Sequence, residues 1–189
     1  MLFTACLMAM MMNAQTANEH LKFKGVPIDG TLSQYVQKMK TAGFSMLGME
    51  NGAAILQGDF AGYKECTISV ETLKGKDLVA KIIVAFPDCN TWSELHGSYL
   101  DLKFMLAEKY GAPSDCLENF QGYSDQRDDN FRMIAVRLDR CRYITTFSTK
   151  AGDIQLKISH KGMSSCYVTL SYYDKINSNI LRKQAIDDL

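Results

Sequence analysis

The sequence predicts an α+β fold, in which antiparallel strands from two successive α-βββ units form the sheet and helices pack on one of its faces. Two segments, 30–44 and 90–113, carry apolar residues at helical spacing between helix-start and helix-stop signals. Two regions, 53–86 and 141–173, instead alternate apolar and polar residues, as half-buried strands do. Short glycine-containing turns divide both regions into runs, which is typical of antiparallel hairpins.

The composition is that of a globular protein without a charge bias. Of the 189 residues, 47% are hydrophobic and 22% are charged, so a packed core is expected rather than disorder. The 21 Lys and Arg residues balance the 21 Asp and Glu residues. This balance, without a basic stripe, argues against a nucleic-acid partner.

The first fourteen residues predict a secretory signal peptide. The run from Met1 to Ala14 is uncharged and apolar, and it is shorter than the roughly 20 residues that a membrane-spanning helix needs. Its length fits the apolar region of a signal peptide that is cleaved near Ala14. Cys6 comes too early in this run for a lipid attachment site, so no lipid anchor is expected. A buried N-terminal helix is the alternative; otherwise the protein is periplasmic or secreted.

The first expected helix spans Gly30–Phe44 and follows an N-terminal segment, residues 15–29. Thr31 and Gln34 have capping-box spacing, which satisfies free backbone amides at the helix start. Gly43 can adopt the left-handed conformation that ends many helices. The apolar stripe of this helix comprises Leu32, Tyr35, Val36 and Met39.

Three strands and a second helix complete the first unit, residues 30–112. The strands are expected over 53–60, 64–73 and 76–86. Thr91 and Glu94 form the capping box of the helix, which ends before Pro113. Its apolar stripe comprises Leu95, Tyr99, Leu102, Leu106 and Tyr110.

The second unit, residues 113–189, is expected to form one compact domain with the first. It begins with a linker or irregular loop over 114–124. A third helix then leads up to Leu138, although a strand from Phe131 onward is the alternative. The apolar residues of this third helix are Phe131, Ile134 and Leu138. The remaining elements are three strands over 141–149, 152–160 and 165–173 and a final helix capped near Asn177.

Three quoted segments carry a resemblance. LKFKGVPIDGTLSQYVQKMKTAGF, the GDFAGYKECTISV hairpin and WSELHGSYLDLKFMLAEKYGAPSD together resemble secreted or periplasmic proteins of Bacteroidetes whose function is not established. The layout of two αβββ units is also similar to the fold of the β-lactamase inhibitor protein, which binds its target through an open sheet face. This resemblance implies a binding face on the sheet. The contact motifs of that inhibitor are not recognisable in this sequence, so the resemblance assigns no binding residue.

The open face of the sheet is the expected binding surface. Tyrosines beside small hydroxyl side chains and a few charges are typical of recognition surfaces, because Tyr offers a large contact area with few rotamers. The alternative is that Thr, Ser, Lys and Tyr simply suit an exposed strand. We expect a protein partner in the envelope or extracellular space, with a small ligand as the alternative. The residues expected to bind are Arg142, Lys157, Tyr167, Thr169 and Tyr173.

Cys141, His160 and Cys166 are expected to lie opposite one another across three strands. A Cys–His pair could form a nucleophile, and two Cys with one His could bind zinc. However, a strand between the two cysteines separates them by roughly 10 Å, which is too far for one zinc ion or a disulfide. Burial also raises the pKa of a thiol. Core packing is therefore the preferred interpretation, and no metal or cofactor is expected.

The sequence contains no phosphate-binding loop and none of the familiar hydrolase motifs. We therefore predict an exported, non-catalytic binding module, with a structural envelope protein or an enzyme that uses Cys166 and His160 as the alternatives. After cleavage at Ala14 the number of cysteines is odd, so at least one thiol stays free. Cys89–Cys116 and Cys66–Cys89 remain alternative disulfides.

Overall fold

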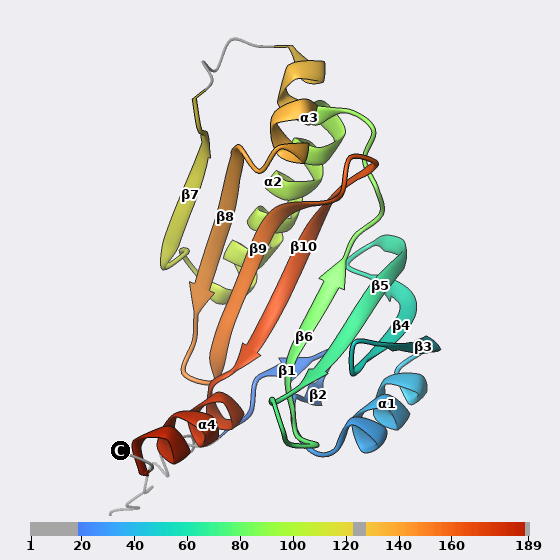
Figure 1. Ribbon diagram of the computed structural model, residues 1–189, viewed down its shortest axis with the longest axis vertical. Coiled ribbons are helices and arrows are strands. Elements are labelled where there is room, and N and C mark those ends of the chain that lie inside the picture. The colour runs from blue at the N-terminus through green and yellow to red at the C-terminus, as the bar shows by residue number, and fades with distance from the viewer. Residues whose placement is uncertain (1–18, 123–127, 188–189) are drawn as a thin grey trace, which may run out of the picture.

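The computed structural model describes residues 19–122 and 128–187 (Figure 1). Within these residues, one eight-stranded antiparallel sheet carries four helices and a two-stranded hairpin. The hairpin pairs β1 (Lys22–Phe23) with β2 (Val26–Pro27). The sheet consists of β3 (Ser45–Glu50), β4 (Ala53–Phe60), β5 (Tyr63–Thr72), β6 (Val79–Ala85), β7 (Asp115–Phe120), β8 (Cys141–Ser148), β9 (Gly152–Lys161) and β10 (Ser165–Asp174). The helices are α1 (Leu32–Thr41), α2 (Trp92–Tyr110), α3 (Asp129–Arg137) and α4 (Lys175–Asp187). The predicted signal peptide, residues 1–14, lies outside the described residues.

The predicted mixture of helices and an antiparallel sheet is confirmed, and the strand order is symmetric. The order β3-β4-β5-β6-β10-β9-β8-β7 places the four strands of the first half on one side of the junction between β6 and β10 and the four strands of the second half on the other. Each half therefore contributes four strands rather than the three expected. Helix α2 packs on β8, β9 and β10, and it therefore lies against the second half of the sheet.

The two strands of the eight-stranded sheet that were not predicted from the sequence, β3 and β7, are the two edges of the sheet. The expected loop over 114–124 is wrong, because residues 115–120 pair with β8 along their whole length. Strand β7 contains Asp115, Glu118 and Asn119, which are residue types that strands usually avoid. Nearly all its side chains are exposed, so the strand lacks the alternation that marks a half-buried one. An edge position tolerates such residues, since polar side chains there also discourage pairing with another chain.

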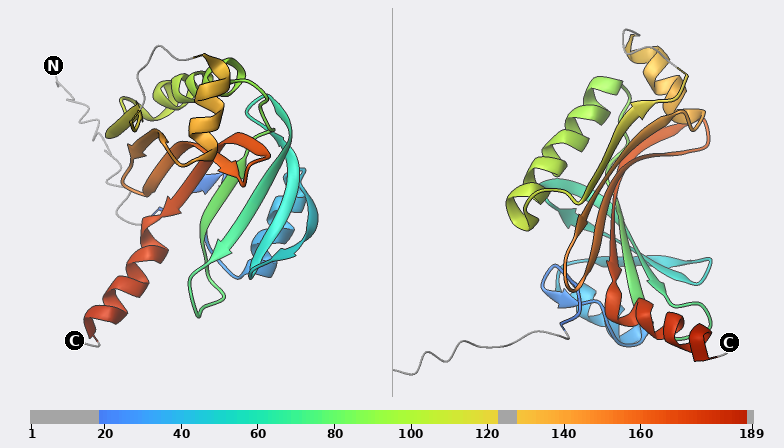
Figure 2. Two further views of the ribbon diagram at one scale, coloured as in Figure 1. Left: turned by 45° about the horizontal axis from the view of Figure 1, so that its top comes forward. Right: turned by 90° about the vertical axis from the view of Figure 1, so that its left-hand side faces the viewer.

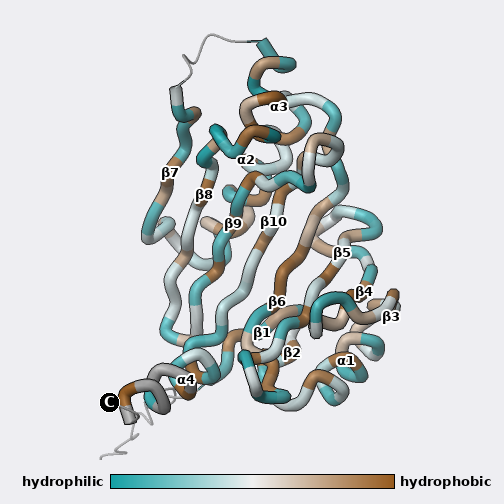
Figure 3. The backbone as a smooth tube through the Cα atoms, viewed as in Figure 1, coloured by the Kyte–Doolittle hydropathy of each residue, from teal (hydrophilic) through white to brown (hydrophobic). Residues whose placement is uncertain are grey.

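One face of the sheet is buried and the other is open. A row of side chains across six strands on the buried face has at most 2% exposure: Leu56, Ile68, Val84, Leu170, Leu156 and Thr145. Figure 3 shows that hydrophobic character concentrates in the middle of the sheet, where β6 and β10 meet. Figure 2 (right) shows α1 and α2 on the same side of the sheet, while α4 extends from its other side at the lower end.

The expected caps of the first two helices are confirmed. Thr31 and Gln34 form a capping box at the start of α1, and Thr91 and Glu94 form one at the start of α2. After α1, the N–H of Phe44 donates to the carbonyl of Met39 (3.1 Å). This bond belongs to a Schellman motif that needs a left-handed residue, and Gly43 supplies it at φ 96°.

The third helix exists, but its apolar stripe was assigned to the wrong side. Phe131, Ile134 and Leu138 are 47%, 41% and 46% exposed, while Met133 and Val136 are buried against the core. The sequence offers both sets at helical spacing. The side of α3 that packs against α2 and the strands is the one that carries Met133 and Val136, so the other set remains exposed.

The fourth helix starts earlier than expected. Asp174, not Asn177, accepts the free amide at its N-terminus, through the bond from Asn177 N–H to the Asp174 carboxyl group (2.8 Å). The side chain of Asn177 is buried and donates instead to the carbonyls of Ile28 (3.1 Å) and Val79 (2.8 Å). Asp174 also accepts the N–H of Leu21 (2.8 Å). Hydrogen bonds to Asp174 and Asn177 therefore hold the segment before α1 against the start of α4.

Candidate binding face

The open face is built from alternate residues of each strand in the second half of the sheet. Ile144 pairs with Lys157, and Lys157 pairs with Thr169 on the next strand. Since residues paired across a ladder lie on the same face, the three side chains form one row. Leu117 of β7 pairs with Ile144 and extends the row to the edge. The row combines two apolar side chains, one cation and one hydroxyl group.

Four of the five expected binding residues lie close together on this face. Tyr167 lies two residues before Thr169 on β10 and pairs with Ser159, so it is next to the row of Lys157 and Thr169 on the same face. Arg142 lies on β8, two residues before Ile144, and its side chain is exposed. Lys157 is also exposed, whereas Tyr167 and Thr169 are half-buried. These four side chains therefore form a surface patch, which we call the Arg142–Lys157 patch.

The fifth residue, Tyr173, lies apart from this patch. It is six residues from Tyr167 along β10, which corresponds to about 20 Å in an extended strand. The ammonium group of Lys81 lies 5.5 Å from the centroid of its ring and 3.0 Å from a carboxylate oxygen of Glu71. Tyr173 therefore belongs to a separate, charge-balanced cluster near α4.

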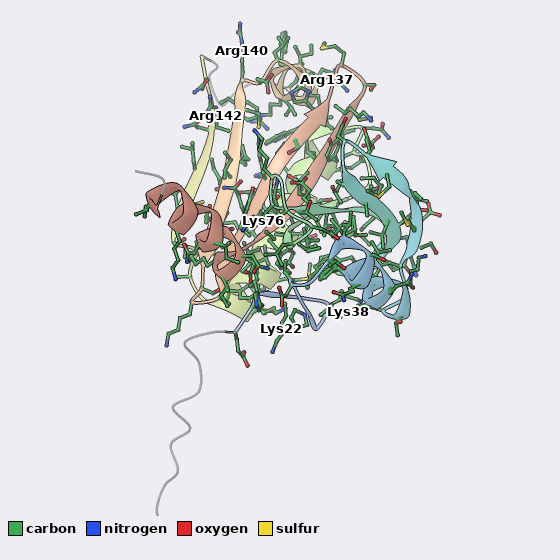
Figure 4. The ribbon with its side chains drawn as sticks, turned by 60° about the horizontal axis from the view of Figure 1, so that its bottom comes forward. Lys22, Lys38, Lys76, Arg137, Arg140 and Arg142 are labelled. Carbon is green, nitrogen blue, oxygen red and sulfur yellow. The ribbon has the colours of Figure 1, made fainter. Side chains whose placement is uncertain are left out.

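The charges of the open face are paired at one end and unpaired at the other. Lys81 and Glu71 form an ion pair, as do Lys175 and Asp153 at 2.8 Å. Arg142, by contrast, forms no ion pair with any residue that the structure describes, and the same holds for Lys157 within residues 19–122 and 128–187. Figure 4 shows Arg137, Arg140 and Arg142 gathered at the end of the molecule where α3 leads into β8. Of these three arginines, Arg142 lies on the open face, where it and Lys157 carry positive charge without an ion pair among the described residues.

A pocket of about 370 Å³ opens beside the patch, between β8 and β9. Its volume lies within the range of roughly 300–1,000 Å³ that is usual for ligand sites. It is lined by Val136, Asp139, Cys141, Arg142, Ile144, Lys157, Ile158, Ser159 and His160. The pocket therefore brings two expected binding residues together with Cys141 and His160, two of the three members of the expected cysteine and histidine row.

A second hollow, of about 490 Å³, lies at the other end of the open face. It is formed between the β3–β4 turn and the β5–β6 turn, and Glu50, Glu71 and Lys74 contribute its charges. Glu71 is already paired with Lys81, and the remaining charges of Glu50 and Lys74 have opposite signs, so this hollow has less net charge than the pocket between β8 and β9.

Only part of the expected row of cysteines and histidine is formed, because the β8–β9 ladder ends before Cys141 and leaves that residue unpaired with His160. Cys166 lies opposite His160 in the β9–β10 ladder. The ring nitrogens of His160 are engaged elsewhere: Nδ1 lies 2.9 Å from the carbonyl oxygen of Gly162 and Nε2 lies 3.1 Å from a carboxylate oxygen of Asp139. The imidazole is therefore held by the loops at the end of the sheet and is not aligned with a thiol.

The pKa values of this row also favour unreactive thiols. Burial raises the pKa of Cys141 to about 12 and raises that of Cys166 above its ordinary value. Thiols with a raised pKa are protonated near neutral pH and are poor nucleophiles. The Gly162 carbonyl, followed by the Asp139 carboxylate, raises the pKa of His160, because both accept hydrogen bonds from the protonated ring.

No disulfide and no metal cluster is formed within the described part of the chain. Cys66, Cys89, Cys116, Cys141 and Cys166 are all free thiols, so neither alternative disulfide is made. Among residues 19–122 and 128–187, no three His, Cys, Asp or Glu side chains gather closely enough to hold a metal ion. None of the helices described is both long and apolar enough to cross a membrane.

Sequence analysis missed the residues that β7 and the α3–β8 connection add to the site. Leu117 and Asn119 reach the open face beside Ile144 and Arg142 only because residues 115–120 form a strand. Asp139 approaches His160 through a left-handed backbone conformation at φ 57°, which Asp tolerates better than most residues. No protein-family model, curated protein or solved structure matches this chain.

Proposed function

We propose that this protein is an exported, non-catalytic binding module that recognises an acidic surface of a protein partner through the open face of its sheet. The observation that carries the proposal is the Arg142–Lys157 patch, where two cations without an ion pair among the described residues lie beside Tyr167 and Thr169 on a face that α1 and α2 leave uncovered. Export is supported by the uncharged apolar run from Met1 to Ala14.

The chemistry of the patch favours an acidic partner. An unpaired cation at an interface steers an oppositely charged surface and repels a like-charged one. Tyr167 is half-buried, so its ring is already ordered and loses little freedom on contact. The hydroxyl groups of Ser159 and Thr169 lie 3.0 Å apart and supply neutral hydrogen-bonding groups between the charges. The layout resemblance to the β-lactamase inhibitor protein points to the same face.

The enzyme alternative receives less support. It depends on Cys166, whose thiol is 1% exposed and has a raised pKa, and on His160, whose ring nitrogens are already engaged. A nucleophile needs access to its substrate and a substantial thiolate fraction. The geometry of the described residues offers neither at this position.

The test is a cross-linked capture experiment with a matched control. Purified protein is incubated with native cell envelope and culture fluid, cross-linked, and analysed by quantitative mass spectrometry. We expect Lys157→Glu and Tyr167→Asp each to reduce capture of the same partner at least tenfold. Lys38→Glu, which reverses an exposed charge on α1, is the control and should not change capture. A partner captured equally by all variants would contradict the proposal.

A further inference from the structure

The β8–β9 ladder ends before its strands do. The last pair at this end is Ile144↔Lys157, although β8 begins three residues earlier, at Cys141, and β9 continues to Lys161. Over these residues β8 stays paired with β7, and β9 stays paired with β10. The two strands therefore separate, as Figure 1 shows where β8 and β9 diverge toward α3. The pocket of about 370 Å³ occupies this opening.

The neighbouring ladders show which backbone groups of β8 face the opening. Gln121 N–H donates to the carbonyl of Arg140 (2.7 Å), so Arg140 directs its backbone groups toward β7. Because the direction alternates along an antiparallel strand, Arg142 also faces β7. Cys141, which lies between them, faces the side of β9 instead. Its backbone groups therefore border the opening.

The same reasoning identifies the groups on β9. Phe86 N–H donates to the carbonyl of Val168 (3.0 Å), so Val168 directs its backbone groups toward β6. Ile158, its partner on β9, must then face away from β10 and toward β8. His160 is two residues further along and has the same direction. The opening is thus bordered by the backbone of Cys141 on β8 and of His160 on β9, which have ladder geometry and no pairing across the β8–β9 gap.

The side chains around the opening make it cationic. Arg142, Lys157 and His160 line it together with one carboxylate, that of Asp139. Asp139 is committed to His160 at 3.1 Å. The two remaining cations form no ion pair among the residues that the structure describes. Val136, Ile144 and Ile158 supply apolar contact area in the same pocket.

We propose that this opening binds the carboxyl end of an extended peptide, with the terminal carboxylate between Arg142 and Lys157 and the last amides in the gap between Cys141 and His160. Extended peptides bind to free strand edges through backbone hydrogen bonds, and side-chain pockets add specificity. Charge-assisted bonds to a carboxylate are stronger than neutral ones. The inference deepens the proposed function, since it assigns a ligand class to one end of the same face.

Two other uses of the pocket fit less well. Cys141 is a poor nucleophile there, because burial raises its pKa to about 12. A free small carboxylate would satisfy the cations and leave the backbone edges of Cys141 and His160 without a strand partner across the gap. A peptide end satisfies both, because it carries amides at strand spacing next to its carboxylate. The two sources of the carboxylate are distinguishable by experiment.

The experiment uses methyl groups that line the site. The full protein, labelled at isoleucine methyl groups, is titrated by NMR with a randomised tetrapeptide pool that carries a free carboxylate. Ile144 and Ile158 should shift, and their titration gives the dissociation constant. Amidation of the carboxyl end, or Lys157→Gln or Arg142→Gln in the protein, should each weaken binding about tenfold, as loss of a charge-assisted bond predicts. Lys150→Gln, at the exposed turn at the other end of the β8–β9 hairpin, is the matched control and should leave the constant unchanged.

The results that would overturn the proposal are measured with the same methyl signals and the same peptides. Absence of shifts at Ile144 and Ile158 with millimolar peptide overturns it, and so does equal binding of the amidated pool. N-acetylalanine that binds as tightly as the peptides overturns the peptide assignment in favour of a small carboxylate. Methylation of the penultimate peptide nitrogen should weaken binding, because it removes an edge hydrogen bond. None of these outcomes depends on partner capture, so failure here is separable from failure of the proposed function.

Discussion

The substitution Asp174→Ala should destabilise the protein strongly, although Asp174 lies outside the candidate binding face. Its side chain is fully buried at the junction of β10 and α4. It accepts the backbone N–H groups of Leu21 and Asn177, both at 2.8 Å, and lies 3.2 Å from Nδ1 of His20. Alanine removes the acceptor for two backbone donors and the N-terminal cap of α4 at once.

The expected magnitude follows from those two donors. A buried donor that loses its acceptor costs about 1–3 kcal/mol, so the pair costs about 2–6 kcal/mol. Total stabilities of single domains are about 5–15 kcal/mol, so the loss is a large share of the whole. The measurement is urea unfolding of the wild type and the variant at neutral pH, with linear extrapolation to water.

A control separates this effect from the loss of any carboxylate. Asp153, which lies opposite Tyr173 in the β9–β10 ladder, pairs with Lys175 at 2.8 Å, but both side chains are more than a third exposed. Exposed ion pairs contribute about 0–1 kcal/mol, so Asp153→Ala should cost less than that. If Asp174→Ala also costs less than about 1 kcal/mol, the two buried bonds do not hold the N-terminal segment as argued.

Three further predictions follow from single contacts. Iodoacetamide should label Cys116 first and Cys66 and Cys166 last in the folded protein, since Cys116 is an exposed residue and the other two are buried. Mass spectrometry of early time points checks the order, and early labelling of Cys66 or Cys166 would contradict it. The pKa of His160 is raised in the folded state, so its stabilising contribution is complete below its ordinary pKa of about 6.5 and is lost as the pH rises through the raised value. Asp139→Asn should therefore lower the His160 pKa in an NMR titration and reduce the loss of stability over that window; an unchanged pKa would refute the contact. Gly152→Ala should cost about 1–3 kcal/mol in urea unfolding, because its added Cβ would lie 2.2 Å from a backbone oxygen; a neutral result would show that the strand end shifts freely.

Much of the fold could be predicted because local signals agree with the final packing. Capping boxes at Thr31 and Thr91 mark helix starts in the sequence and in the structure alike. The alternation along β5, β6, β9 and β10 reflects strands with one buried face. The edge strands could not be found in this way, because a strand exposed on both faces has no hydrophobic period. The exposed stripe of α3, which includes Phe131, was misassigned since periodicity shows that a helix has an apolar side but not which neighbour covers it.

The site could be predicted only in part. Alternation placed Arg142, Lys157, Tyr167 and Thr169 on the open face, and their register brings them together. Alternation also placed Tyr173 on that face, but position along the strand separates it from the others. The opening between β8 and β9 has no sequence signal, because it arises where the ladder ends. Such a feature depends on how α3 and the loop through Asp139 direct the chain into β8.

The position of β10 has a consequence for how the protein reaches its native state. This strand follows all the others in sequence, yet it lies between β6 and β9 and joins the two halves of the sheet. Contacts between β6 and β10 close a long loop, and sheets rich in such distant contacts fold slowly. Until β10 docks, β6 presents an unpaired edge of buried-type residues, including Ile82 and Val84. Exposed edges of this kind promote association between chains. The folding intermediate without β10 is therefore the species most vulnerable to aggregation, and variants that slow the docking of β10 should lower soluble yield before they lower equilibrium stability.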